Sequence, residues 1–129
     1  MSYLLDSTVI IDYSLGREAG VRIVEELFGR TGDLYVCEVV ACEALSGGTP
    51  EGRLEIRSLL DALDYVAIDP AAAQWAGERR AERVPGGSRR HLGDALIAGL
   101  AWRIGATIVT RNARDFEAYG VPVLDYAAD

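Results

Sequence analysis

The sequence contains no lysine, one histidine and only two cysteines, and these scarcities limit the kinds of site it can build. Cys37 and Cys42 form no CxxC pair and no cluster with histidine at zinc-ligand spacing, so no zinc site is expected. The two cysteines are interpreted as buried, reduced thiols of a cytoplasmic protein. His91, the only histidine, is expected to be a surface or loop residue and not a ligand or general base.

Long apolar runs are also missing. The N-terminus has no basic segment, and Asp6 interrupts the first apolar run almost at once, so no signal peptide is expected. The longest apolar run extends from Leu92 towards Trp102, contains Asp94 and is too short to span a bilayer. The sequence therefore predicts a cytoplasmic protein with no membrane partner.

The chain is acidic, and its basic residues are all of one type, arginine. All 13 basic residues are arginine, for which codon bias in a GC-rich genome is the simplest explanation. With 20 acidic residues the formal net charge is −7, which argues against a protein that coats nucleic acid electrostatically. A nucleic-acid enzyme of this charge needs a metal ion, or a local basic patch, to bring phosphate to its acids.

The length of 129 residues, half of them apolar, predicts one domain, 1–129, with a single hydrophobic core. Short β-rich runs alternate with stretches of helical periodicity, which indicates a three-layer α/β/α sandwich with a central parallel sheet of four to five strands. The expected strands are 3–5, 34–37, 65–68, 107–109 and 121–124, and the expected helices are 7–15, 19–30, 38–46, 50–63, 71–83 and 92–104, with an exposed loop at 85–90.

Polar residues follow the expected strands where each strand ends. In parallel sheets of this kind the ligand site lies beyond the carboxyl ends of the strands. Four acids come from four segments near that edge, two polar residues accompany the last of them, and the full set is Asp6, Glu43, Asp94, Asp115, Thr110 and Asn112.

Each acid alone has an ordinary interpretation. Asp6 fits a helix N-cap, Asp94 a first-turn acid stabilised by the helix dipole, Glu43 an exposed helix acid and Asp115 a loop acid. Glu43 and Asp94 also sit among aliphatic residues, where a buried carboxylate needs a partner. Together, four carboxylates at one edge would repel one another without a counter-charge, and their hard oxygens suit Mg²⁺ or Mn²⁺. Such a site is suited to phosphodiester hydrolysis by a metal-activated water.

Two stretches resemble a known family. The run Asp6-Ser7-Thr8-Val9-Ile10 resembles the opening motif of PIN domains, and the segments 94–101 and 105–116 together are similar to the C-terminal signature of that family. The second is the more specific, and the resemblance covers essentially the whole chain. It implies a VapC-type toxin: an RNA endonuclease that is neutralised by a cognate VapB-type antitoxin and is commonly a homodimer.

The resemblance also implies residue roles. Asp6, Glu43, Asp94 and Asp115 would bind the Mg²⁺ or Mn²⁺ and catalyse cleavage, although either Asn112 or Asp115 could be the fourth residue at the metal. Two departures from the family pattern stand out: a threonine where serine or asparagine is more usual, and an Arg- and Gly-rich approach to Asp94 in place of a short Pro-containing turn. The supporting polar residues would be Thr8, Thr110 and Asn112.

Arginines crowd the approach to Asp94 and flank the last acidic motif. They have two interpretations: a solvated helix face followed by an exposed loop, or contacts to RNA phosphates beside the metal site. Trp75 and Trp102 are expected in the core or a dimer interface and not as base-stacking platforms. The arginines in question are Arg79, Arg80, Arg83, Arg89, Arg90, Arg111 and Arg114.

Three alternatives stay open at this point. A haloacid-dehalogenase-like phosphatase also begins with an Asp after its first strand, but it needs a second Asp two residues on, where this chain has Thr8, and a lysine. A flavodoxin-like or receiver-like domain would need a phosphate loop or a lysine. A catalytically silent PIN-like interaction module would keep the fold and the partner without the chemistry.

Overall fold

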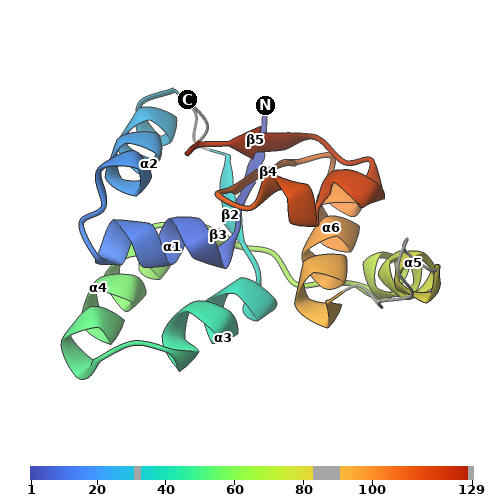
Figure 1. Ribbon diagram of the computed structural model, residues 1–129, viewed down its shortest axis with the longest axis horizontal. Coiled ribbons are helices and arrows are strands. Elements are labelled where there is room, and N and C mark those ends of the chain that lie inside the picture. The colour runs from blue at the N-terminus through green and yellow to red at the C-terminus, as the bar shows by residue number, and fades with distance from the viewer. Residues whose placement is uncertain (31–32, 83–90, 128–129) are drawn as a thin grey trace.

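The computed structural model describes residues 1–30, 33–82 and 91–127. Strands and helices alternate along this chain, as the periodicity predicts (Figure 1). The strands are β1 (Tyr3–Leu5), β2 (Leu34–Val36), β3 (Asp64–Tyr65), β4 (Thr107–Thr110) and β5 (Val123–Asp125). The helices are α1 (Ser7–Ser14), α2 (Glu18–Arg30), α3 (Glu38–Ser46), α4 (Pro50–Asp61), α5 (Pro70–Ala81) and α6 (Leu92–Ile104), followed by the 3₁₀ turns η1 (Ala113–Asp115) and η2 (Glu117–Tyr119).

The five strands form one parallel sheet in the order β3-β2-β1-β4-β5. The strand order therefore reverses beside β1, and such a reversal opens a crevice at the carboxyl ends of the strands. In the register between β1 and β4, Leu5 faces Val109. The residues that follow them, Asp6 and Thr110, are thereby brought side by side at that edge.

Helices cover both faces of the sheet, which makes the molecule a three-layer α/β/α sandwich. In Figure 1, α1, α2 and α4 lie to one side of the strands and α6 and α5 to the other, with α3 below the carboxyl ends between them. The strands are apolar because both of their faces are covered. Leu4, Leu5, Ile108 and Val109 are fully buried in one cluster that also includes Ile97 of α6.

Local signals account for most helix boundaries. The Thr49 and Asp69 side chains accept hydrogen bonds from the first turns of α4 and α5, and each of these helices begins with proline. Gly105 ends α6 with a φ of 69°, a left-handed conformation that glycine adopts without a Cβ penalty. Among the described residues, no helix has the length and apolarity needed to cross a membrane.

Three expectations of the sequence are wrong, and a fourth falls outside the described residues. The third strand covers only 64–65 and not 65–68, because the chain leaves β2 and the Ile68 N–H donates to Glu38 Oε1 at 3.0 Å instead. The helix expected over 71–83 ends at Ala81, since Glu82 has an extended backbone. Arg83 and the loop expected at 85–90 lie outside the described residues. Cys42 is exposed and not buried, whereas Cys37 is buried as expected.

Candidate active site

Asp6 lies at the centre of the carboxyl edge of the sheet, and two threonines hold its carboxylate. Its side chain is buried, and its Oδ2 accepts hydrogen bonds from Thr110 Oγ1 at 2.8 Å and Thr8 Oγ1 at 3.3 Å. The threonines are fixed in turn by backbone amides, since Arg111 N donates to Thr8 Oγ1 at 3.1 Å and Asn112 N to Thr110 Oγ1 at 3.0 Å. Both threonines therefore contact the Asp6 carboxylate directly, whereas Asn112 takes part through its backbone. The loop after β4 is thereby tied to the start of α1.

Four carboxylates from four elements share this edge. Asp6 follows β1, Glu43 is in α3, Asp94 is in the first turn of α6 and Asp115 ends η1. The pKa of Asp94 is raised from 3.8 to about 6, first by burial and then by the charges of Asp6, Asp115 and Glu43, against a lowering by the His91 side chain. Burial is also the first cause that raises the pKa of Asp6 and of Glu43, and the neighbouring acids add to it. The set therefore behaves as one electrostatic unit.

These interactions test the ordinary interpretations of single acids as a helix cap, a first-turn acid or an exposed helix acid. Asp6 occupies the N-cap position of α1, but its side chain makes no capping hydrogen bond and is turned to the threonines. Asp94 is a first-turn acid, yet its pKa is raised, so burial and repulsion outweigh the helix dipole that would lower it. Glu43 is exposed on α3, as its ordinary interpretation has it, yet its pKa is raised by burial and by the charge of Asp6.

Whether this set suits a metal ion depends on its charge and donor chemistry. Four carboxylates supply hard oxygen donors, and within the described ranges none of the four takes part in an ion pair. Also within those ranges, no three acidic, thiol or imidazole groups are close enough to hold a metal ion as they stand. Mg²⁺ keeps several waters as ligands and is usually bound through only one or two carboxylates directly. The donor set therefore fits a hydrated divalent cation.

Of the arginines considered for RNA binding, the structure describes Arg79, Arg80, Arg111 and Arg114. Arg111, which follows Thr110, forms an ion pair with Asp12. Arg79 lies over the ring of Trp75 at 5.1 Å and contacts Glu82 at 3.4 Å, and the neighbouring Arg80 borders a groove between α5 and α6. Arg83, Arg89 and Arg90 lie outside the described residues, and Arg114 is exposed on η1.

The tryptophans and the histidine lie on α5 and α6. Trp75 and Trp102 stack with ring centroids 5.3 Å apart and an interplanar angle of 9°. Trp102 is 47% exposed, so the expectation of a core position is wrong for it, and a position at an interface stays a prediction. His91 is exposed at the N-cap of α6, as expected.

Sequence reasoning missed four residues around this site. The Ser7 side chain is hydrogen-bonded to Glu43 and lowers its pKa, and Gly93 lets Glu43 come close to α6. Asp12 is buried and binds Tyr126, which adjoins β5. Only Asp12 carried a signal in the sequence: it is an acid one helical turn after the apolar Val9 and Ile10, where a buried charge needs a partner.

Known proteins are similar to this chain over most of its length. Residues 3–122 match the PIN domain family. The chain is similar to Ribonuclease VapC11 of Mycobacterium tuberculosis, with 34% identity over 119 residues that cover 88% of each chain. It is also similar to the tRNA(fMet)-specific endonuclease VapC of Shigella flexneri, with 33% identity over 128 residues that cover 93% of each chain.

Solved structures share the fold. A chain of DNA-bound VapBC from Salmonella typhimurium superposes with a TM-score of 0.77 and 25% sequence identity, over 98% of this chain and 99% of that one. The match therefore extends over nearly the whole length of both chains.

Proposed function

This chain belongs to the PIN-domain family, and we propose that it is a VapC-type endoribonuclease toxin whose RNA cleavage depends on a divalent cation, Mg²⁺ or Mn²⁺. The observation that carries the proposal is the set of four carboxylates from four elements: the pKa of Asp6, of Glu43 and of Asp94 is raised by burial and by neighbouring acids, and within the described ranges none of the four takes part in an ion pair. The curated relatives named as ribonucleases span nearly the same length as this chain, which supports the activity.

Each residue has a proposed role at the metal. Asp6, Glu43, Asp94 and Asp115 would hold the cation, which when bound polarises a phosphoryl oxygen and lowers the pKa of a bound water. Thr110 and Thr8 orient the Asp6 carboxylate through the hydrogen bonds described above.

Asn112 is the alternative to Asp115 as the fourth residue at the metal, since its exposed side chain and Asp115 both follow β4. Asp6 is buried at this site and Asp94 is half-buried. Residues 1–129 are proposed to form a single nuclease domain with this one site.

Partners and location form part of the same proposal. A VapB-type antitoxin is the proposed protein partner, because the similar Salmonella typhimurium chain comes from a VapBC assembly. The stacked and partly exposed Trp75 and Trp102 are the proposed centre of a homodimer interface. A cytoplasmic location follows from an RNA substrate. Of the arginines, Arg79, Arg80, Arg89, Arg90 and Arg111 are proposed to contact RNA phosphates.

The test is cleavage of a tRNA and rRNA pool by the purified chain, mapped by sequencing, with Mg²⁺, with Mn²⁺ and with EDTA. Cleavage is expected with either metal and not with EDTA, and it should be lost in Asp6→Asn and in Asp94→Asn. Asp64→Asn is the matched control, because Asp64 is exposed on the edge strand β3 of the same sheet. Cleavage that survives chelation, or that both site variants retain, would overturn the proposal. Partner binding without any cleavage would identify a silent PIN-like module instead.

A further inference from the structure

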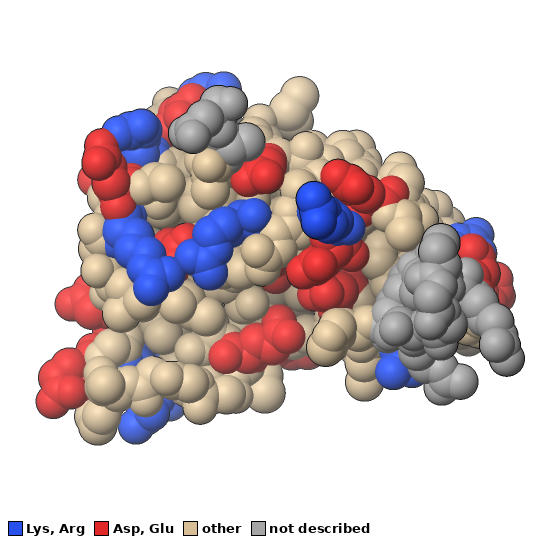
Figure 2. Space-filling view, viewed as in Figure 1, with Lys and Arg blue, Asp and Glu red and all other residues tan. Residues whose placement is uncertain are grey.

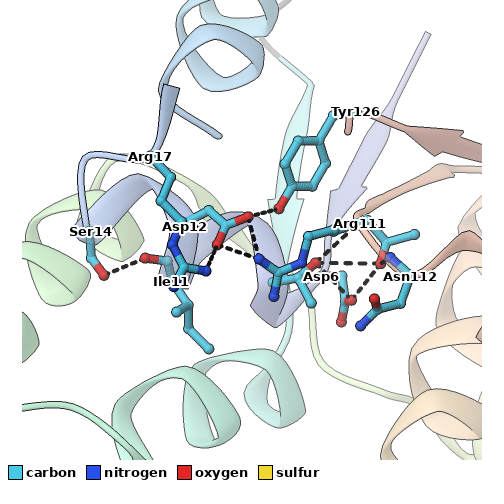
Figure 3. A network of polar contacts seen from close by, with 10 residues as sticks. Asp6, Ile11, Asp12, Ser14, Arg17, Arg111, Asn112 and Tyr126 are labelled. Atoms are coloured by element: carbon cyan, nitrogen blue, oxygen red, sulfur yellow. Dashed lines mark hydrogen bonds and ion pairs between the residues drawn. The ribbon is translucent and has the colours of Figure 1, made fainter. Parts of the chain in front are cut away.

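A second polar cluster lies beside the carboxylate site and is centred on Asp12 of α1 (Figure 3). Asp12 Oδ1 accepts from Arg17 Nη1 and from Arg111 Nη1, both at 2.8 Å, and Arg111 Nη1 also lies 3.1 Å from Asp12 Oδ2. Tyr126 donates its hydroxyl to Asp12 Oδ2 at 2.6 Å. One carboxylate therefore binds two guanidinium groups and a phenol.

Packing holds the Asp12 carboxylate in place. Its side chain is 4% exposed, and α2 crosses α1 so closely that a Cβ atom at Gly20 would lie 2.7 Å from Asp12 Cβ. The hydrogen bond to Asp12 and burial both raise the pKa of the Tyr126 hydroxyl, so it stays protonated as a donor at neutral pH. The two arginines are thus attached to a fixed point.

The arginines keep binding capacity towards solvent. Arg17 is 54% and Arg111 is 40% exposed, and two positive charges meet one negative charge. In the described parts of the chain, every side-chain hydrogen bond of either arginine is made by its Nη1 atom. The Nε and Nη2 groups keep their N–H donors, and these form the edge that binds a phosphate with two parallel hydrogen bonds. A purely structural ion pair would need one arginine and would leave no net charge.

This cluster is directly connected to the candidate active site. The Arg111 amide donates to Thr8 Oγ1, which donates to Asp6 Oδ2, so a chain of two hydrogen bonds joins the cluster to the central acid. Figure 2 shows arginine side chains over α1, with acidic side chains gathered beside them on the same face. In Figure 3 Arg111 lies between Asp12 and Asp6. The positive cluster and the acidic side chains therefore lie on the same face of the molecule.

We propose that Arg17 and Arg111, held on Asp12, form a binding site for a backbone phosphate of the RNA strand next to the phosphate that is cleaved. The inference rests on the proposed ribonuclease function and adds Arg17, Asp12 and Tyr126 to it. A chain of net charge −7 repels RNA as a whole, so fixed arginines beside the acids give the strand its local attraction and its direction across the site.

The test is RNA binding by Arg17→Gln and Arg111→Gln in an Asp94→Asn background, which keeps the RNA intact. Fluorescence anisotropy with a fluorescein-labelled tRNA pool in Mg²⁺ gives Kd across a series of salt concentrations. Each variant should raise Kd about tenfold and reduce the slope of log K against log salt by about 0.7. Arg103→Gln is the matched control, because Arg103 forms an ion pair with a single aspartate, Asp69, at 2.9 Å and is not part of this cluster. This variant should change neither Kd nor the salt dependence.

The outcomes separate this inference from the proposed function. Unchanged binding in either cluster variant, or an equal loss in Arg103→Gln, overturns the inference while cleavage by the unvaried chain still stands. If the unvaried chain binds RNA through the arginines but does not cut it, the ribonuclease proposal fails and the binding site remains. Arg17 is at the surface, so its variant tests the site even if Arg111→Gln reduces stability. Weakened antitoxin binding with unchanged RNA binding would also overturn the inference.

Discussion

Glu43 Oε2 lies 2.8 Å from the position that a Cβ atom would occupy at Gly93. The missing side chain lets the first turn of α6 approach α3, so that Asp94 stands beside Glu43 at the carboxyl edge. No other atom is as close to this position, and the next side chain, Val39 Cγ1, is 3.6 Å away. Gly93 therefore acts as a positioning residue for the acidic site, because any side chain there would displace the carboxylate of Glu43.

Gly93→Ala should reduce function more than stability. Only the end of a flexible side chain has to move, so the free energy of unfolding should change by less than about 1 kcal/mol. A displaced carboxylate should lower both Mn²⁺ affinity and the cleavage rate about tenfold. Calorimetric Mn²⁺ titration and single-turnover cleavage measure the two effects. Gly29→Ala in α2 is the control, since a Cβ atom there meets nothing within 4 Å. Equal metal affinity in both variants would show that Gly93 has no positioning role.

A shorter acid tests the same contact from the other side. Glu43→Asp withdraws the carboxylate from Gly93, so adding Gly93→Ala to that variant should cost less than about twofold further in Mn²⁺ affinity. If Gly93→Ala lowers Mn²⁺ affinity by the same factor in the Glu43→Asp variant as in the unvaried protein, the contact between Gly93 and Glu43 is not the cause of the lost affinity.

Asp94→Asn should stabilise the metal-free protein although it abolishes cleavage. With the pKa raised from 3.8 to about 6, the folded state binds more protons at Asp94 than the unfolded state between these values. Stability in EDTA should therefore fall as the pH rises through this window, and the asparagine removes that loss. A gain on the order of 1 kcal/mol, or about 3–4 °C in Tm, is expected at about pH 7.5 and should vanish near about pH 4. A lower Tm for Asp94→Asn at neutral pH in EDTA would contradict it.

The stabilisation by bound metal should increase with pH, whereas the stability of the metal-free protein should decrease. Protons compete with the cation for Asp94, and the pKa of Asp6 and of Glu43 is raised as well. Mn²⁺ should therefore raise Tm more at about pH 7.5 than at about pH 5, since deprotonated carboxylates are the metal ligands. Melting curves with and without Mn²⁺ across this range measure the effect, with Asp94→Asn as the variant whose dependence is weaker. A metal-induced shift that is constant with pH would exclude these acids as its origin.

Most of the fold could be predicted from local patterns. The helical periodicity, the prolines before α4 and α5 and the glycine after α6 each act over a few residues, so the elements are close to the expected ranges. The third strand was overestimated because Val66 and Ile68 look like strand residues. The Ile68 N–H instead bonds to Glu38, which is 30 positions away, and such a contact leaves no local pattern.

Asp6 could be placed at the carboxyl edge because it follows β1, whose end the pattern marks, whereas Glu43 and Asp94 lie inside α3 and α6. The Asp12 cluster could not be predicted, because Arg17, Arg111 and Tyr126 come together only through the order of strands and the crossing of α1 with α2. Gly93 had no signal either, since a glycine beside a helix start is ordinary until the opposing Glu43 is placed. Exposure is equally non-local, and for this reason Cys42 was expected to be buried although it is exposed.

Thr110→Val should destabilise the protein and weaken its metal site. Thr110 is fully buried, donates to Asp6 and accepts from the Asn112 amide, so valine leaves two polar groups without their partner. We expect a loss of about 1–3 kcal/mol in urea unfolding. The pKa of Asp6 should also rise, because the hydrogen bond from Thr110 lowers it, and Mn²⁺ affinity at neutral pH should fall. Thr110→Ser keeps the hydroxyl and should keep the metal affinity, and a serine variant as weak as valine would exclude the hydrogen bond as the cause.

Gly99→Ala, in the same helix as Gly93, should have the opposite profile. A Cβ atom at Gly99 would lie 2.5 Å from the carbonyl oxygen of Ala72 and 3.1 Å from Ala76 Cβ, so α5 and α6 would have to separate. Backbone cannot yield as a flexible carboxylate does, and overpacking of this kind costs about 1–3 kcal/mol, or about 3–12 °C in Tm. Cleavage per folded molecule should stay unchanged at a temperature where the variant is folded, because Asp94 is in the first turn of α6 and Gly99 is in the middle of the helix, against α5. Gly77→Ala on α5, where a Cβ atom meets nothing within 4 Å, is the control. A Gly99→Ala protein that melts like this control would show that the two helices are not in the close contact described.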